Sequence, residues 1–357
     1  MTGWIRRLAP STVTALSEVP AATRTALRDG PEEADSFRAA HDGLPALGQI
    51  EVGPPTHVVS SARSTLRVVA WNVARLRHLP ATADLLVREA ADVCVLTEID
   101  KGMARTGNTH RTAELSATIG QHFAYAAEFV ELDLGTEGER AAHAGAVNAL
   151  GFHGNAVLSR CALQRPVLFR LEAEGKWFGR GLGEPRVSGR IAIGGQVTLD
   201  GVAVTVVGLH LESHSDPAHR AGQAARLLEL IAQYDPVAPV LLGGDFNTST
   251  RSGGERMEGL PEDLVRRCVV VPHEPLFTVM AAHGFDCEAC NLPLVPTLRF
   301  ADPAAEAGRG WFPGKIDWIF TLGLVASDPA VIPAIGPDGA ILSDHDAVAV
   351  TVTLPRD

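Results

Sequence analysis

Long apolar runs are missing from this sequence of 357 residues. No segment approaches the roughly 20 consecutive apolar residues with which a helix crosses a bilayer. The start, MTGWIRRLAPSTVTALSEVP, carries Ser, Thr and Glu where an export signal would need a continuous apolar region. We therefore expect a cytoplasmic protein without stable membrane insertion.

Cysteine is scarce, and the five residues present form an odd number. In a chain without a recognisable export signal, this argues against a disulfide framework. Cys287 and Cys290 have the spacing of half a zinc site, but no second pair follows, so structural zinc is disfavoured. A G-x-S-x-G element is also missing, which argues against a serine hydrolase.

A positive net charge is missing too, since the formal charge is −11. This disfavours a broadly basic surface for nucleic acid, although a local basic stripe can exist on an acidic protein. One such stretch runs from Arg160 to Arg190, is rich in glycine and includes Trp177. It is either a solvated loop anchored by aromatic residues or a mobile flap that contacts phosphate. In the second case Arg180 and Arg186 are candidate substrate contacts.

The remaining composition, with 46% hydrophobic residues, is that of a globular protein with a sizeable core. Residues 1–66 contain two short helix-like stretches and end in the linker-like GPPTHVVSSARS, so we predict a helical extension followed by a larger domain at 67–357. From LRVVAWNV onward, apolar strands alternate with amphipathic helical patterns, and Asp200-Gly201 marks a hairpin turn. This order predicts an α/β (α+β) fold with mixed sheets and helices outside.

Several predicted strands have an apolar body and a polar residue at or near one end. These residues are Asn72, Glu98, His210, Asp245, Asn247, Asp317, Asp344 and His345. A buried carboxylate without a partner is costly, so a set of them at strand ends predicts a shared pocket. Carboxylates beside imidazoles and amides suit a hard divalent cation and a phosphate ester, and Mg²⁺ needs only one or two carboxylates.

The motifs WNVARL, LTEID, GNAVLSR, LHLES, GGDFNTST, KIDWIF and LSDHDAV, in this order, resemble the endonuclease/exonuclease/phosphatase superfamily. That superfamily includes pancreatic deoxyribonuclease, AP endonucleases, tyrosyl-DNA phosphodiesterases and neutral sphingomyelinases. The resemblance covers about residue 67 to the end of the chain. It implies a four-layer sandwich of two packed mixed β-sheets flanked by helices.

The resemblance also implies roles for individual residues. The metal ligands would be Glu98, Asn72 and Asp344, holding Mg²⁺ with Mn²⁺ as a substitute. His345, oriented by Asp317, and His210 and Asn247 would face the phosphate, while Asp245 positions or deprotonates the attacking water and Asn155 contacts substrate. Whether Asp245 or the Asp317–His345 pair takes the proton stays open. AP endonucleases carry an acid where this chain has Ala74, which indicates a different branch.

The leading hypothesis is a metal-dependent phosphodiesterase that uses in-line attack of water, with an endonuclease or exonuclease on DNA as one form. The alternative is a phosphatase or lipid phosphodiesterase acting on a small or membrane-borne phosphate ester. A remote alternative is a non-catalytic binding module of the same fold. Specificity resides in loops that a single sequence does not decode, so neither the substrate nor the oligomeric state is predicted.

Overall fold

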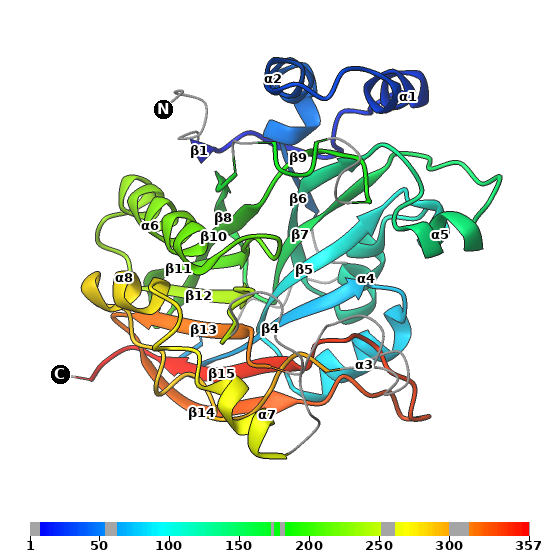
Figure 1. The fold of residues 1–357 in the computed structure, drawn as a ribbon. Helices are drawn as coiled ribbons and strands as arrows, with labels where there is room; N and C mark the ends of the chain where they lie inside the picture. Colours follow the sequence, from blue (N-terminus) through cyan, green and yellow to red (C-terminus); the bar gives the residue numbers. More distant parts are fainter. Residues whose placement is uncertain are drawn as a thin grey trace.

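The computed structural model describes residues 8–53, 63–172, 175–178, 183–250, 261–299 and 314–356, and the side chains of 261–264 are not among them. Two mixed β-sheets pack face to face in these residues, with helices on their outer sides (Figure 1). This confirms the predicted α/β sandwich. None of the helices in the described ranges combines the length and apolarity needed to cross a membrane.

The first sheet has six strands. Their spatial order is β1 (Leu8–Ala9), β8 (Gln164–Arg170), β10 (Ile191–Leu199), β11 (Val202–His210), β12 (Val240–Asp245) and β13 (Asp317–Leu322). β10 and β11 form an antiparallel hairpin whose predicted turn has positive φ at Asp200 (46°) and Gly201 (80°). β11 and β12 are parallel and are joined by helix α6 (Pro217–Tyr234).

The second sheet has nine strands. Its order is β14 (Val325–Ile332), β15 (Ala347–Thr353), β4 (Leu66–Arg75), β5 (Val93–Lys101), β7 (Phe152–Ser159), β6 (His122–Glu131), β3 (Ile50–Gly53) and β2 (Thr12–Val13), with β9 (Arg186–Ser188) on β6. β4 and β5 are parallel and are joined by helix α3 (Leu79–Arg88). β5 is followed by a 3₁₀ turn, η2 (Ala104–Thr106), and by helix α4 (Arg111–Ile119).

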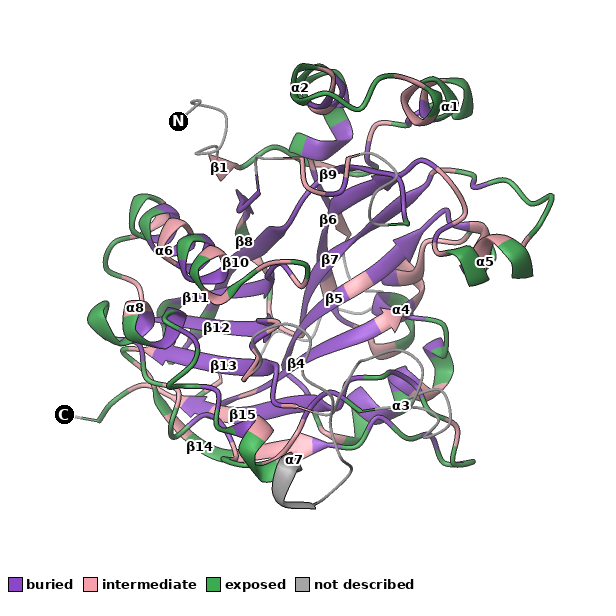
Figure 2. Cartoon of the chain, viewed as in Figure 1, coloured by how far each residue is buried: buried purple, intermediate pink, exposed green. Residues whose placement is uncertain are grey.

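The inner faces of the two sheets form one apolar core. Val68 and Val95 of the nine-stranded sheet lie in it with Leu241 and Ile319 of the six-stranded sheet, all fully buried. Glycines allow the closest approach, because a Cβ on Gly208 would lie 3.0 Å from the Cβ of Val95. The strands are therefore buried on both faces, which explains their nearly continuous apolar sequences (Figure 2).

Helices cover both outer faces. α6 and α8 (Leu276–Ala282) bury apolar side chains against the six-stranded sheet, and α3 and α4 do so against the nine-stranded sheet (Figure 1). Two further helices, α5 (Glu137–Ala142) and α7 (Pro261–Cys268), lie in connecting segments. Figure 2 shows these helices with one exposed and one more buried side, so the amphipathic patterns in the sequence correspond to packed layers.

The N-terminal segment contains the two predicted helices, α1 (Ala21–Asp29) and α2 (Ala34–Asp42), followed by a 3₁₀ turn, η1 (Pro45–Gly48). It also contributes strands to both sheets, since β1 pairs with β8 and β3 pairs with β6. Arg24 of α1 is buried and donates hydrogen bonds to the backbone oxygens of Asn148 and Leu150. Residues 8–53 are thus packed into the sandwich, and most of the expected linker lies outside the described residues.

Candidate active site

The polar residues at the strand ends meet where the two sheets come together. In the six-stranded sheet, His210, Asp245 and Asp317 lie in register on the neighbouring strands β11, β12 and β13. The end of β4 carries Asn72 to the same place from the other sheet. Ser343 fixes the loop before β15 there, because its Oγ donates to the backbone oxygen of Asn72 at 2.7 Å.

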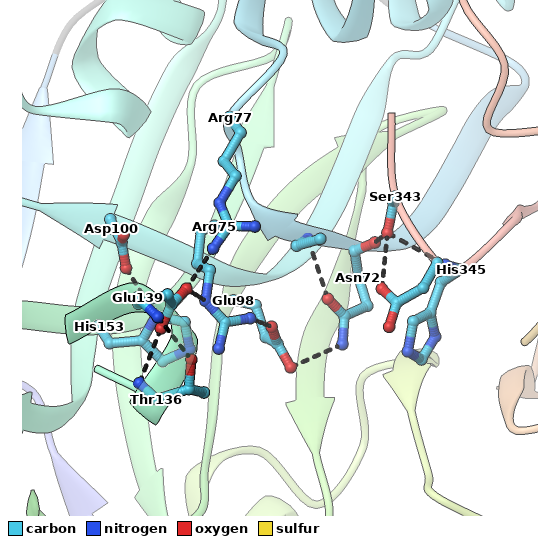
Figure 3. Close-up of polar contacts among 12 residues, drawn as sticks. Asn72, Arg75, Arg77, Glu98, Asp100, Thr136, Glu139, His153, Ser343 and His345 are labelled. Atoms are coloured by element: carbon cyan, nitrogen blue, oxygen red, sulfur yellow. Dashed lines mark hydrogen bonds and ion pairs between the residues drawn. The ribbon is translucent and has the colours of Figure 1, made fainter. Parts of the chain in front are cut away.

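Asn72 connects the two sheets through its side chain. Its Nδ2 donates to Glu98 Oε1 and to Asp245 Oδ2, both at 3.1 Å, while its Oδ1 accepts from the backbone N–H of Ala74 at 3.1 Å. The hydrogen-bond pattern fixes the orientation of the Asn72 amide, because its nitrogen faces two carboxylates and its oxygen faces an N–H. Asn72 therefore holds both carboxylates in place, and Figure 3 shows its contact with Glu98.

Asp317, His345 and Asp245 form a second connected unit. His345 Nδ1 lies 2.9 Å from Asp317 Oδ2, and its Nε2 lies 3.8 Å from Asp245 Oδ2. Burial disfavours a charged imidazole here, but Asp317 and Asp245 hold the pKa of His345 well above its ordinary value. Burial, with a contribution from Asp317, raises the pKa of the Asp245 carboxyl, although His345 and His210 oppose the shift. The two carboxylates thus favour the charged form of the imidazole.

His210 has partners that the sequence interpretation missed. Its Nδ1 lies 3.2 Å from Glu128 Oε2 on β6, and its Nε2 lies 3.5 Å from Asp245 Oδ2. The guanidinium of Arg190 approaches the same ring at 2.9 Å and pairs with Glu128 at 3.4 Å. Glu128 and Arg190 are both buried. The signal in the sequence was a glutamate inside the apolar strand FAYAAEFVEL, since a carboxylate at such a position needs a partner.

Glu98 projects from β5 with an unusual backbone, at φ 59°. Its side chain is 22% exposed and forms an ion pair with Arg75, another residue that the sequence interpretation missed. Burial opposes ionisation, but Arg75, His153 and His210, together with the hydrogen bond from Asn72, hold the pKa of Glu98 well below its usual range. Glu98 is therefore a carboxylate that keeps its negative charge while part of it reaches solvent.

The remaining candidates for metal or phosphate contacts differ in how far they are buried and in their hydrogen-bond partners. Asp344 is exposed, and its Oδ1 accepts from Ser343 Oγ at 3.4 Å. Asn247 donates its Nδ2 to the backbone oxygen of Leu211 at 3.0 Å. Asn155 is fully buried; its Oδ1 accepts from the backbone N–H of Glu98, while its Nδ2 has no hydrogen-bond partner among the described residues.

The basic stretch is an anchored segment in the part that the structure describes. Arg186 is buried, pairs with Glu131 at 2.9 Å and with Glu184, and stacks over Trp177. Trp177 donates its Nε1–H to Glu212 at 2.8 Å. The charge of Arg186 is thus matched inside the protein rather than presented on a surface flap, and Arg180 lies outside the described residues.

The chain belongs to the endonuclease/exonuclease/phosphatase family, whose sequence model matches residues 69–345. Members of this family are hydrolases that act on phosphate esters and generally depend on a divalent metal. No curated protein sequence matches the chain.

Several solved structures share this fold. An endonuclease/exonuclease/phosphatase from Beutenbergia cavernae is 21% identical with a TM-score of 0.53, and the match covers 82% of this chain and 72% of that one. The human Nocturnin catalytic domain with bound sulfate is 13% identical with a TM-score of 0.53, covering 83% and 97%. A mannosyl-6-phosphatase from Bacteroides thetaiotaomicron is 15% identical with a TM-score of 0.52, covering 81% and 100%. At these identities the likeness concerns the fold.

The residues present fit a hard divalent cation. Glu98 offers an ionised, partly exposed carboxylate, and Asp344 adds an exposed one on the loop that Ser343 ties to Asn72. One or two carboxylates with retained waters satisfy Mg²⁺. Asp245, Asp317 and His345 also offer ligand atoms within 4.8 Å of one another. A protonated imidazole has no free lone pair, so this second group fits a metal ion less well than the Glu98 side when His345 is charged.

Proposed function

We propose that this protein is a magnesium-dependent phosphodiesterase that hydrolyses its substrate by in-line attack of water, with Mn²⁺ as a substitute ion. The observation that carries the proposal is the continuous series of contacts from Glu98 through Asn72, Asp245 and His345 to Asp317. It joins a metal-binding carboxylate to a charged imidazole across the boundary between the two sheets.

Each part of this series supports one requirement of phosphoryl transfer. Glu98 and Asp344 would hold the ion, which when bound supplies Lewis-acid stabilisation of the phosphoryl oxygens. Asn72 keeps Glu98 and Asp245 in a fixed relation, since one amide nitrogen binds both carboxylates. Fixed donors around the phosphate contribute most when they need no reorganisation during the reaction.

Asp245 is the better candidate for accepting the proton of the attacking water. Its raised pKa makes it a stronger base than an ordinary aspartate. His345 already carries a proton, so it serves as a positive donor to a nonbridging oxygen. The buried Asn155 supplies a further donor, because its Nδ2 has no partner in the described part of the chain. His210, supported by Glu128, and Asn247 complete the phosphate side.

The substrate is the least constrained part of the proposal. A nucleic acid is the leading candidate substrate. Arg180 is then the one remaining residue of the basic stretch that is predicted to contact it. The buried, ion-paired state of Arg186 favours the second candidate, a phosphatase or lipid phosphodiesterase acting on a small or membrane-borne phosphate ester, because the predicted flap loses one cation. A cytoplasmic location remains a prediction from the sequence.

A turnover screen tests the proposal. Plasmid DNA, abasic duplex, single strands, 5′-tyrosyl ends, nucleotides and sphingomyelin are each incubated with the protein and Mg²⁺, with and without EDTA. We expect hydrolysis that EDTA abolishes and added Mg²⁺ restores. Activity that survives EDTA would refute the metal requirement, and no turnover of any phosphate ester would favour a non-catalytic binding module.

A further inference from the structure

Arg75 lies at the end of β4 in a costly backbone conformation. Ala74, Arg75 and Leu76 have φ of 44°, 70° and 54°, the left-handed region that non-glycine residues rarely adopt. The pairing of β4 with β5 also changes register between Asn72 and Arg75. Strain of this kind is retained when the surrounding structure enforces it, and it concentrates at functional sites.

The strained turn directs the guanidinium of Arg75 onto Glu98. Its Nη1 lies 2.9 Å from Glu98 Oε2, and its Nε lies 2.9 Å from Glu139 Oε1 on α5. Glu139 is itself fixed by a capping box with Thr136 and by an ion pair with Arg105. Arg75 is therefore held from both sides, as Figure 3 shows, and its side chain is only 18% exposed.

The two oxygens of Glu98 consequently have different partners. Oε1 accepts from Asn72 at 3.1 Å, on the side that leads to Asp245 and His345. Oε2 faces the fixed positive charge of Arg75 at 2.9 Å. A second divalent ion bridging through Oε2 would have to displace this guanidinium, and two like charges a few ångströms apart repel each other strongly in a partly buried site.

We propose that Arg75 acts as a built-in cation that restricts the site to a single divalent ion. The proposal rests on the proposed metal-dependent function and goes further by fixing how many ions Glu98 supports. Arg75 is a positioning residue, since it acts through Glu98. Ala74, two residues after Asn72, carries no charge, so no acid at that position offsets the positive charge of Arg75.

Metal binding to the stripped protein tests this directly. The full chain is treated with EDTA, dialysed and titrated with Mn²⁺, while calorimetry and the electron paramagnetic resonance of free Mn²⁺ report stoichiometry. We expect one ion per wild-type chain. Arg75→Gln frees Oε2 and removes the repelling charge, so this variant should bind the first ion about tenfold more tightly and take up a second. Two ions sharing Glu98 would also give an exchange-coupled spectrum.

Two variants control for local damage. Arg77→Gln removes a neighbouring charge that pairs with Glu139 but not with Glu98, so it should still bind one ion with wild-type affinity. Arg75→Lys keeps the positive charge and should also bind one ion. Thermal unfolding establishes that each variant is folded before it is titrated.

The outcomes separate this inference from the function on which it rests. Two ions on the wild-type chain would overturn the role of Arg75 without touching the metal requirement, and so would an Arg75→Gln variant that binds like wild type. The number of ions bound by the wild-type chain tests the role of Arg75 even if Arg75→Gln fails to fold. No ion on the folded wild-type chain at millimolar Mn²⁺ would overturn both the inference and the metal-dependent function.

Discussion

Replacing Asp317 with Asn tests the charged imidazole at the centre of the site. The change keeps the shape of the side chain and a hydrogen bond to His345 Nδ1, but it removes a negative charge 2.9 Å away. Two unit charges about 4 Å apart interact by about 4 kcal/mol at an effective dielectric constant of about 20. Removing this interaction disfavours the charged imidazole, but Asp245 remains 3.8 Å from Nε2, so we expect the pKa of His345 to fall while part of its support remains.

The sign of the pH dependence follows from the raised pKa. His345 binds its proton more tightly in the folded protein than at its ordinary value of 6.5. The stability that the charged pair contributes is therefore fully present below about pH 6.5 and is lost as the pH rises through the folded pKa. In Asp317→Asn the folded pKa is lower, so the stability contribution is smaller and its loss is complete at a lower pH, while the loss of activity should begin at a lower pH.

The assay is an NMR titration of the His345 ring proton in wild type and Asp317→Asn, combined with rates for both single variants and the double variant. We expect His345→Ala to lose on the order of 10³-fold in rate and Asp317→Asn to approach that loss. The double variant should be scarcely slower than His345→Ala, because residues acting as one unit are not additive. An unchanged His345 pKa, or losses that multiply in the double variant, would refute the coupling.

Three further predictions address the metal side, the second histidine and the core. Glu98→Gln should lower the rate by several orders of magnitude, since it removes the ionised metal carboxylate; a folded variant with wild-type turnover would contradict the assignment of the ion. Glu128→Gln should cost about 10–100-fold in rate by leaving His210 without its carboxylate partner, whereas a change confined to the melting temperature would mean that Glu128 is purely structural. Gly208→Val should lower the free energy of unfolding by about 1–3 kcal/mol, measured by urea denaturation. The reason is that the new Cβ alone would lie 3.0 Å from the Cβ of Val95. A variant as stable as wild type would mean that the two sheets are less closely packed at this position.

Much of the fold was predictable because both sheets use continuous apolar strands that end in recognisable turns. The Asp200-Gly201 hairpin and the helix of α6 are local features, set by turn chemistry and by helical periodicity. The strands of the N-terminal segment were not predicted. β1 and β2 have only two residues each, and such short strands are defined by the partners they pair with rather than by their own pattern.

The sequence by itself determined which polar residues stand at the ends of apolar strands, and from this it predicted that Glu98, Asp245 and His345 lie together. Only the tertiary structure decided their partners. Arg75 lies in a recognised motif, Arg190 ends the basic stretch and Glu128 lies in an apolar strand, but none of these patterns shows the opposite charge that the folded chain brings beside each residue. Arg186 shows the same rule in reverse: the basic, glycine-rich stretch suggested either a solvated loop anchored by aromatic residues or a surface flap, but packing against Glu131 and Trp177 placed Arg186 inside. Hydrogen bonds and ion pairs form between residues distant in the chain, so no local pattern encodes them.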